Sequence, residues 1–248
     1  MRGLKRFTLA AAVVALAGSS LAPAAVPTAS TAAPLSAARS TASAAHSHTF
    51  ELTATGHSTA PVHWLACKPI EYRVNTAHMP KRMIPVVQSV FRSIQQQTGA
   101  RFRYAGHTSH SFSSTTHAGT PTIYLAFTDR TRVAGQVFSW PGQIGVGGPA
   151  AAWYLTSKGG RFESITYGRV LLSTKFAGPR TGGGVSWRSL IMHEVGHTLN
   201  LEHRAAATDV MHASLTDRSP SKFSKAEVTA LKKVLQRSGC DYSAWKKL

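Results

Sequence analysis

The sequence predicts a mixed α/β or α+β fold with one sheet and about three helices. Strand-like and helix-like patterns alternate along the chain from Ile70 to Leu235. The length of 248 residues, 43% of them hydrophobic, suits one medium-sized domain with appendages. Only two cysteines are present, which excludes a disulfide-dense scaffold. A charged fraction of 15% argues against disorder of the whole chain.

The N-terminal residues carry targeting signals rather than fold signals. Residues 1–24 resemble a signal peptide, with a basic start, the apolar run Phe7–Ala17 and an Ala22-Pro23-Ala24 cleavage site. The apolar run is shorter than the roughly 20 residues of a spanning helix, so an uncleaved anchor is the less favoured alternative. Residues 25–60 are predicted to be an Ala/Ser/Thr-rich spacer or short pro-segment, and residues 61–248 the folded domain. We expect a secreted, extracellular protein with no membrane span after signal removal.

The first half of the domain contains three strand patterns and one helix pattern. Ile70–Val74 alternates like a half-buried strand. Pro85 suits the first turn of a helix whose apolar residues recur at helical spacing until Gly99. Phe102–Tyr104 and Ile123–Phe127 are predicted strands on either side of a Ser/Thr/His-rich loop.

The second half begins with weaker signals. Val133–Ser139 is predicted to be an edge strand and the Gly/Pro-rich run Pro141–Pro149 a loop. Arg169–Ser173 is typical of a buried strand. Gly182–Gly184 breaks the chain before a helix that is predicted to begin at about Ser186.

The last helix has clear end signals. Ser224 can cap it, with Glu227 three residues later, and Gly239 is predicted to end it. Its apolar stripe consists of Val228, Leu231 and Leu235.

The chemistry is concentrated in the segment that reads His-Glu-Val-Gly-His-Thr-Leu-Asn-Leu-Glu-His from residue 193. Helical positions four apart differ by only about 40° in direction, so His193 and His197 share one face and can share a metal. A turn after His197 is needed to bring His203 to the same ion. Zinc in catalytic sites typically keeps three protein ligands and one water. Glu194 lies beside that face, where it can take a proton from the water during hydrolysis of a peptide bond without a covalent intermediate.

This spacing resembles the signature of the metzincin metalloproteases, His-Glu-x-x-His-x-x-Gly-x-x-His followed by a Met-turn. Met211 stands eight residues after His203, which is most similar to the matrixin branch in a secreted, bacterial-type form. The resemblance implies that His193, His197 and His203 bind one catalytic zinc, that Glu194 is the general base and that Met211 packs beneath the metal. It also implies an α+β catalytic domain with a twisted mixed sheet of about five strands, two long helices and a small C-terminal subdomain carrying a third helix.

Three positions bear on the branch. Asn200 replaces the signature Gly, and Asn tolerates the left-handed backbone of the turn better than other non-Gly residues. Ala213 stands where astacin-like and serralysin-like relatives carry Tyr. Arg204 follows the third His, where astacin-like and adamalysin-like enzymes carry an acid. The matrixin-like branch therefore fits best.

The other candidate ligands are assigned to structural roles. Cys67 and Cys240 are predicted to form a disulfide, because two cysteines in an exported chain favour this. No segment before the domain resembles the Pro-Arg-Cys-Gly cysteine switch of matrixins. The residues His107, His110 and His117 are interpreted as part of a solvated loop, since the loop lacks the Asp of the matrixin structural zinc site. Calcium is not expected because acidic residues are scarce.

The predicted function is a secreted zinc-dependent endopeptidase that acts on protein or peptide substrates as a monomer. Two alternatives remain: a zinc-containing envelope-binding protein without hydrolysis, and a hydrolase of cell-wall peptides. The intact Glu194 favours hydrolysis, because a purely structural site needs no base. The net charge of +18 indicates either a solvated basic surface or attraction to anionic cell-envelope polymers. No pattern of a specific nucleic-acid module is present.

Overall fold

The computed structural model describes residues 50–54, 60–65, 68–109, 121–128, 132–133, 136–138, 143–155, 160–175, 185–235 and 246–247. Several predictions concern residues outside these ranges: the signal peptide, most of the spacer, Cys67, Cys240, His110, His117, Gly182–Gly184 and Gly239. In the described part of the chain, no helix is long and apolar enough to cross a membrane.

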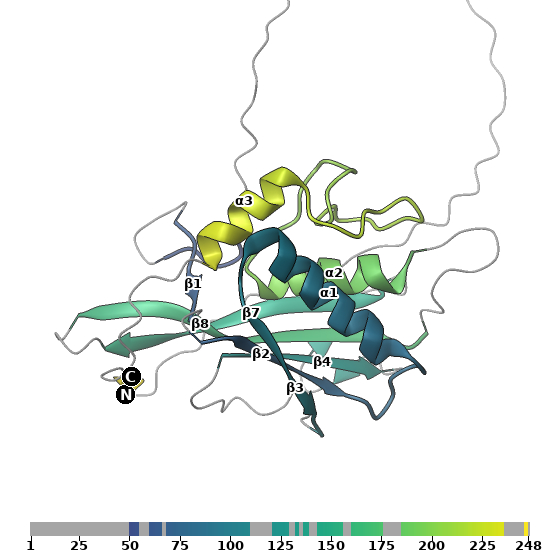
Figure 1. Ribbon diagram of the computed structural model, residues 1–248, viewed down its shortest axis with the longest axis horizontal. Coiled ribbons are helices and arrows are strands. Elements are labelled where there is room, and N and C mark those ends of the chain that lie inside the picture. The colour runs from purple at the N-terminus through teal and green to yellow at the C-terminus, as the bar shows by residue number, and fades with distance from the viewer. Residues whose placement is uncertain are drawn as a thin grey trace, which may run out of the picture.

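One mixed sheet of seven strands forms the base of the described structure (Figure 1). Its strands are β1 His63–Trp64, β2 Ile70–Asn75, β3 Phe102–His107, β4 Thr122–Thr128, β7 Gly145–Leu155, β8 Arg161–Ser173 and β9 Lys246–Lys247. The order is β3-β2-β4-β8-β7-β9, with β1 beside β8. All pairings are parallel except those of β7, which runs antiparallel to β8 and β9. A separate two-stranded ladder joins β5 Arg132–Val133 and β6 Gln136–Val137.

Three helices, α1 Met83–Thr98, α2 Trp187–Thr198 and α3 Lys225–Val234, gather on one face of this sheet in the described residues (Figure 1). Helix α1 ends at Gly99, where a φ of 77° lets its N–H donate to the Gln95 carbonyl at 2.8 Å. Helix α3 begins with a complete capping box between Ser224 and Glu227. The predicted α+β class with a mixed sheet and three helices is confirmed, and the sheet predicted to have about five strands has five longer strands together with the two-residue strands β1 and β9.

The hydrophobic core lies between the helices and the sheet. The α1 side chains at helical spacing, Val87, Val90, Phe91 and Ile94, are fully buried. Phe91 stacks on Tyr72 of β2 with ring centroids 3.8 Å apart, which joins α1 to the sheet. The indole N–H of Trp64 in β1 donates to the Thr198 carbonyl at 3.0 Å, which holds the end of α2 in place.

The loop predicted over Pro141–Pro149 is wrong from Gly145 onward, because these residues form the first half of β7. The glycines that indicated a loop have a packing role instead: a Cβ on Gly145 or Gly147 would overlap Glu194 of α2. Strand β7 also contains Pro149, which suits an edge position: among the described residues this part of β7 pairs with β8, and β9 pairs with β7 at Tyr154 and Leu155. Close helix–sheet packing therefore produced a sequence pattern that looks like a loop.

Smaller differences concern element lengths. The predicted edge strand Val133–Ser139 contributes only to the β5–β6 ladder, which is separate from the sheet. Strand β8 begins at Arg161 rather than Arg169, because its first half pairs with β7 and β1. Helix α3 ends at Val234 with Leu235 as its C-cap, so the predicted end at Gly239 is wrong. In α3, Val228 is only half-buried, and the buried face consists of Glu227, Ala230, Leu231 and Val234. These boundaries depend on packing partners that are distant in sequence.

Candidate metal centre

Helix α2 carries the first two histidines of the motif in a buried position. Ser186 caps the helix, since its side chain accepts a hydrogen bond from the Ser189 N–H at 2.9 Å. Every residue from Ser189 to Thr198 is buried. The Ser189 hydroxyl donates to the Ser219 carbonyl at 3.0 Å, which ties the helix to the C-terminal part of the domain. The motif is thus built on a rigid element rather than on a loop.

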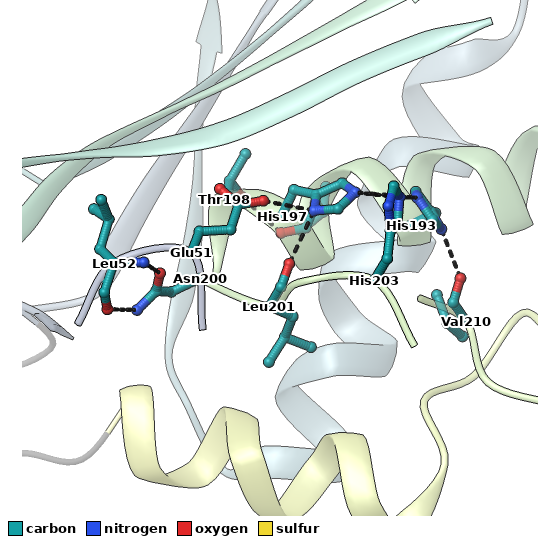
Figure 2. Close-up of polar contacts among 10 residues, drawn as sticks. Glu51, Leu52, His193, His197, Thr198, Asn200, Leu201, His203 and Val210 are labelled. Atoms are coloured by element: carbon teal, nitrogen blue, oxygen red, sulfur yellow. Dashed lines mark hydrogen bonds and ion pairs between the residues drawn. The ribbon is translucent and has the colours of Figure 1, made fainter. Parts of the chain in front are cut away.

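The three histidines of the motif bring their Nε2 atoms together, as Figure 2 shows. The separation is 3.1 Å between His193 and His197, and 3.2 Å from each of these to His203. A tetrahedral zinc with Zn–N bonds of about 2.0–2.1 Å requires nitrogens about 3.3 Å apart, close to this spacing. The three side chains could therefore hold one metal ion.

The tautomers of two rings support a cation at this point. The Nδ1 of His193 lies 2.7 Å from the Val210 carbonyl, and the Nδ1 of His197 lies 2.9 Å from the Leu201 carbonyl. A carbonyl only accepts, so each Nδ1 carries the proton and each Nε2 presents a bare lone pair. Two such lone pairs repel each other unless a positive ion lies between them, so the donor set fits zinc.

Burial keeps these histidines neutral. Burial, reinforced by the neighbouring histidines, lowers the pKa of His193 well below 6.5. Burial also lowers the pKa values of His197 and His203 to about 4. At neutral pH all three rings are therefore available as ligands without first losing a proton.

Glu194 lies on the same helix with 1% of its surface exposed. Its Oε1 has no hydrogen-bond partner among the described residues, although a buried carboxylate oxygen normally has one. Burial, with a smaller contribution from the charge of Glu51, raises its pKa well above 4.5. A water held next to a metal at the three histidines would satisfy this oxygen.

A left-handed turn redirects the chain after α2. Asn200 has a φ of 71°, which confirms the predicted left-handed conformation. Its N–H donates to the His197 carbonyl at 2.9 Å, and the Leu201 N–H donates to the Gly196 carbonyl at 3.1 Å. These two bonds form a Schellman motif, with Asn in the position that Gly usually takes. The turn allows His203 to meet the other two histidines.

Met211 lies beneath the motif and is fully buried. Its sulfur occupies the space that a Cβ on Gly196 would need, so it packs directly on the helix turn between the first two histidines. Its N–H donates to Glu227 Oε1 at 2.8 Å, and its carbonyl accepts from the Arg204 N–H at 2.8 Å. The capping glutamate of α3 therefore also positions the Met211 backbone. Ala213, two residues further on, is half-buried.

The sequence analysis did not identify Glu51, which lies in the segment predicted as spacer or pro-segment. Its Oε1 is 2.7 Å from Nδ1 of His197, and its side chain is 3% exposed. The next residue, Leu52, exchanges two hydrogen bonds with the Asn200 side chain, at 2.7 and 2.9 Å (Figure 2). The only available signal was the apolar pair Phe50 and Leu52 after a long Ala/Ser/Thr-rich stretch.

Of the other candidate ligands, His107 lies in the described part of the chain and is not part of the three-histidine cluster. His107 ends β3 with an exposed side chain whose ring lies edge-on to Tyr104 at 6.3 Å. His110 and His117 lie outside the described residues, as do Cys67 and Cys240. The disulfide between these cysteines stays a prediction.

No family model matches the sequence, and no curated protein matches it. Among solved structures, the chain is similar to metalloproteinase-II from Bacteroides fragilis, with 12% identity and a TM-score of 0.39. The match covers 71% of this chain and 56% of that chain. A likeness at this level carries no functional argument, so the function must be argued from the residues of the site.

Proposed function

We propose that this protein is a secreted zinc-dependent endopeptidase of the metzincin type, most similar to the matrixin-like branch. The observation that carries the proposal is the triangle of histidine Nε2 atoms, 3.1–3.2 Å apart, beside a buried Glu194 with an unpartnered oxygen. A metal site with a free carboxylate next to it suits hydrolysis by an activated water.

Each residue of the site has its own role in the proposed reaction. His193, His197 and His203 would hold the ion, and the Val210 and Leu201 carbonyls keep the first two rings in the ligating tautomer. Zinc, when bound, supplies polarisation of the peptide carbonyl and lowers the pKa of a water. Glu194 accepts the proton of the attacking water on its carboxylate and then delivers it to the leaving nitrogen. No covalent bond between protein and substrate is needed.

The closest alternative is a zinc-containing protein that binds anionic envelope polymers without hydrolysis. Glu194 argues against it, because a closed structural site does not need a buried carboxylate without a partner. A hydrolase of cell-wall peptides uses the same chemistry and differs only in substrate. Secretion and the preference for protein or peptide substrates belong to the same proposal.

Metal analysis with chelation tests the proposal. The purified mature protein should contain one zinc per chain and cleave casein or gelatin. Excess chelator should abolish cleavage, and added zinc should restore it. Parallel assays with cell-wall peptides distinguish an endopeptidase that acts on proteins from a hydrolase of cell-wall peptides. Absence of zinc after purification and zinc addition, or full activity in excess chelator, would contradict the proposal.

A further inference from the structure

We propose that Glu51 is a positioning residue for the metal ligand His197, delivered by residues 50–54, which we call the N-terminal strap. The inference deepens the proposed function and rests on the metal site described above. It assigns a role to a segment that lies upstream of the domain predicted from the sequence.

The strap is attached to the turn that follows α2. The Asn200 side chain accepts from the Leu52 N–H at 2.7 Å and donates to the Leu52 carbonyl at 2.9 Å. The same amide donates to the Val62 carbonyl at 3.2 Å. Phe50 forms an antiparallel bridge with Leu201 and is buried. The residue before Glu51 and the residue after it are therefore both held against the turn.

These attachments place the Glu51 carboxylate against the far side of a metal ligand (Figure 2). Its Oε1 lies 2.7 Å from the His197 Nδ1, and the two side chains are 3% and 2% exposed. The single Nδ1 proton is directed at the Leu201 carbonyl, 2.9 Å away, with the carboxylate beside it. Neither Glu51 oxygen accepts a hydrogen bond from a described residue. The polar neighbour of this buried carboxylate is thus the imidazole of a metal ligand.

Charge explains why a carboxylate would be kept there. A buried anion without a partner is costly, and three neutral histidines do not offset it. A divalent cation at the three Nε2 atoms carries two positive charges, which Glu194 and Glu51 together balance. A carboxylate behind a ligating imidazole also raises the basicity of the ring and fixes its orientation. Loss of such a partner typically lowers metal affinity by about 10–100-fold.

The test is the zinc affinity of Glu51→Gln in the mature exported chain, measured by competition with a chelator. Affinity should fall about 10–100-fold relative to wild type. The visible absorption of the cobalt-substituted protein should also change, since it reports the ligand field at His197. Glu51→Met, which has a similar length and no polar group to satisfy, is measured in the same way in case the amide disturbs folding.

Glu71→Gln is the matched control. Glu71 is also a buried glutamate, 6% exposed, but it lies in β2 and pairs with Arg73 and Arg103. This variant should lower the free energy of unfolding and leave zinc affinity and the cobalt spectrum unchanged. The inference would be overturned if both Glu51 variants kept the zinc affinity of wild type, or if Glu71→Gln lost as much zinc affinity as they do. In either case the proposed metal site itself would not be contradicted. A wild-type protein that binds no zinc would overturn the proposed function as well.

Discussion

Among single residues, Glu194 combines burial, a raised pKa and an oxygen without a described partner with a place beside the three histidines. Glu194→Gln keeps the size of the side chain but cannot take up the proton of the attacking water. We expect this variant to retain one zinc per chain and to lose about 10²–10⁴-fold in kcat/KM. Metal analysis and peptide cleavage measure the two quantities. Cleavage close to the wild-type rate would remove Glu194 from its role as base.

Asn200 has two roles. Its backbone adopts the left-handed conformation of the turn, and its side chain holds the N-terminal strap. From the sequence, Asn200→Gly is expected to be close to neutral, because Gly suits left-handed backbone. The structure changes this expectation, since the buried amide makes three hydrogen bonds to Leu52 and Val62. Removing it leaves backbone groups of both residues without these partners.

We therefore predict that Asn200→Gly lowers the free energy of unfolding by about 1–3 kcal/mol. Asn200→Asp keeps the acceptor for the Leu52 N–H, but it sets a buried carboxylate oxygen against the Leu52 and Val62 carbonyls, so it should lose at least as much. Asn200→Val should lose most, because a β-branched residue also fits the left-handed backbone poorly. Urea unfolding and zinc affinity are the measurements. A Gly variant as stable as wild type would show that the strap does not depend on this amide.

At the scale of elements, the contact between α2 and β7 depends on two glycines with different neighbours. A Cβ on Gly147 would overlap the backbone carbonyl of Glu194, which cannot move without shifting the helix. A Cβ on Gly145 would overlap the side chain of Glu194, from Cγ to Oε1, which can rotate away from the three histidines. The two positions should therefore respond differently to the same substitution.

We expect Gly147→Ala to lower the free energy of unfolding by about 1–3 kcal/mol through overpacking. Gly145→Ala should have the smaller effect on stability but lower kcat about 10–100-fold, because the base is displaced. Each variant serves as the control for the other in thermal unfolding and peptide cleavage. A Gly145→Ala enzyme with wild-type kcat would show that the carboxylate does not need this space.

Helices were easier to predict than strands because the residues that start and stop a helix lie close to its ends in the sequence. The caps at Ser186 and Ser224 and the stop at Gly99 act within four residues of the chain, so the sequence shows them directly. The sequence did not predict the strand that begins at Gly145. Its glycines are required by close packing against Glu194, about 50 residues away in the sequence, and not by their sequence neighbours.

At the scale of the whole molecule, burial of the histidines makes stability depend on pH. In the unfolded chain a histidine has a pKa of about 6.5, whereas burial lowers the pKa of His197 to about 4. At a pH between these two pKa values, His197 is protonated in the unfolded chain but not in the native state. The free energy of unfolding therefore falls as the pH falls. Burial raises the pKa values of Glu51 and Glu194, and these groups act in the opposite direction.

A comparison of metal-free wild type with metal-free His197→Gln isolates the histidine, because both proteins share the two carboxyl groups. The stability of wild type relative to the variant should fall by about 3 kcal/mol between pH 7 and pH 4. Urea unfolding at several pH values measures this difference. A difference that is independent of pH would mean that His197 titrates normally in the native state.

The sequence by itself determined the starts of α2 and α3, the end of α1, the α+β class and the spacing that places His193 and His197 on one face of α2. These features depend on residues within a few positions of one another, so periodicity and capping suffice to read them. Only the tertiary structure decided that Gly145 begins a strand and that Glu51 stands behind His197. Leu52 and Asn200 are 148 positions apart, and their contact exists only because the sheet and α2 together bring the strap to the turn. Such contacts arise from the packing of whole elements, which no local pattern encodes.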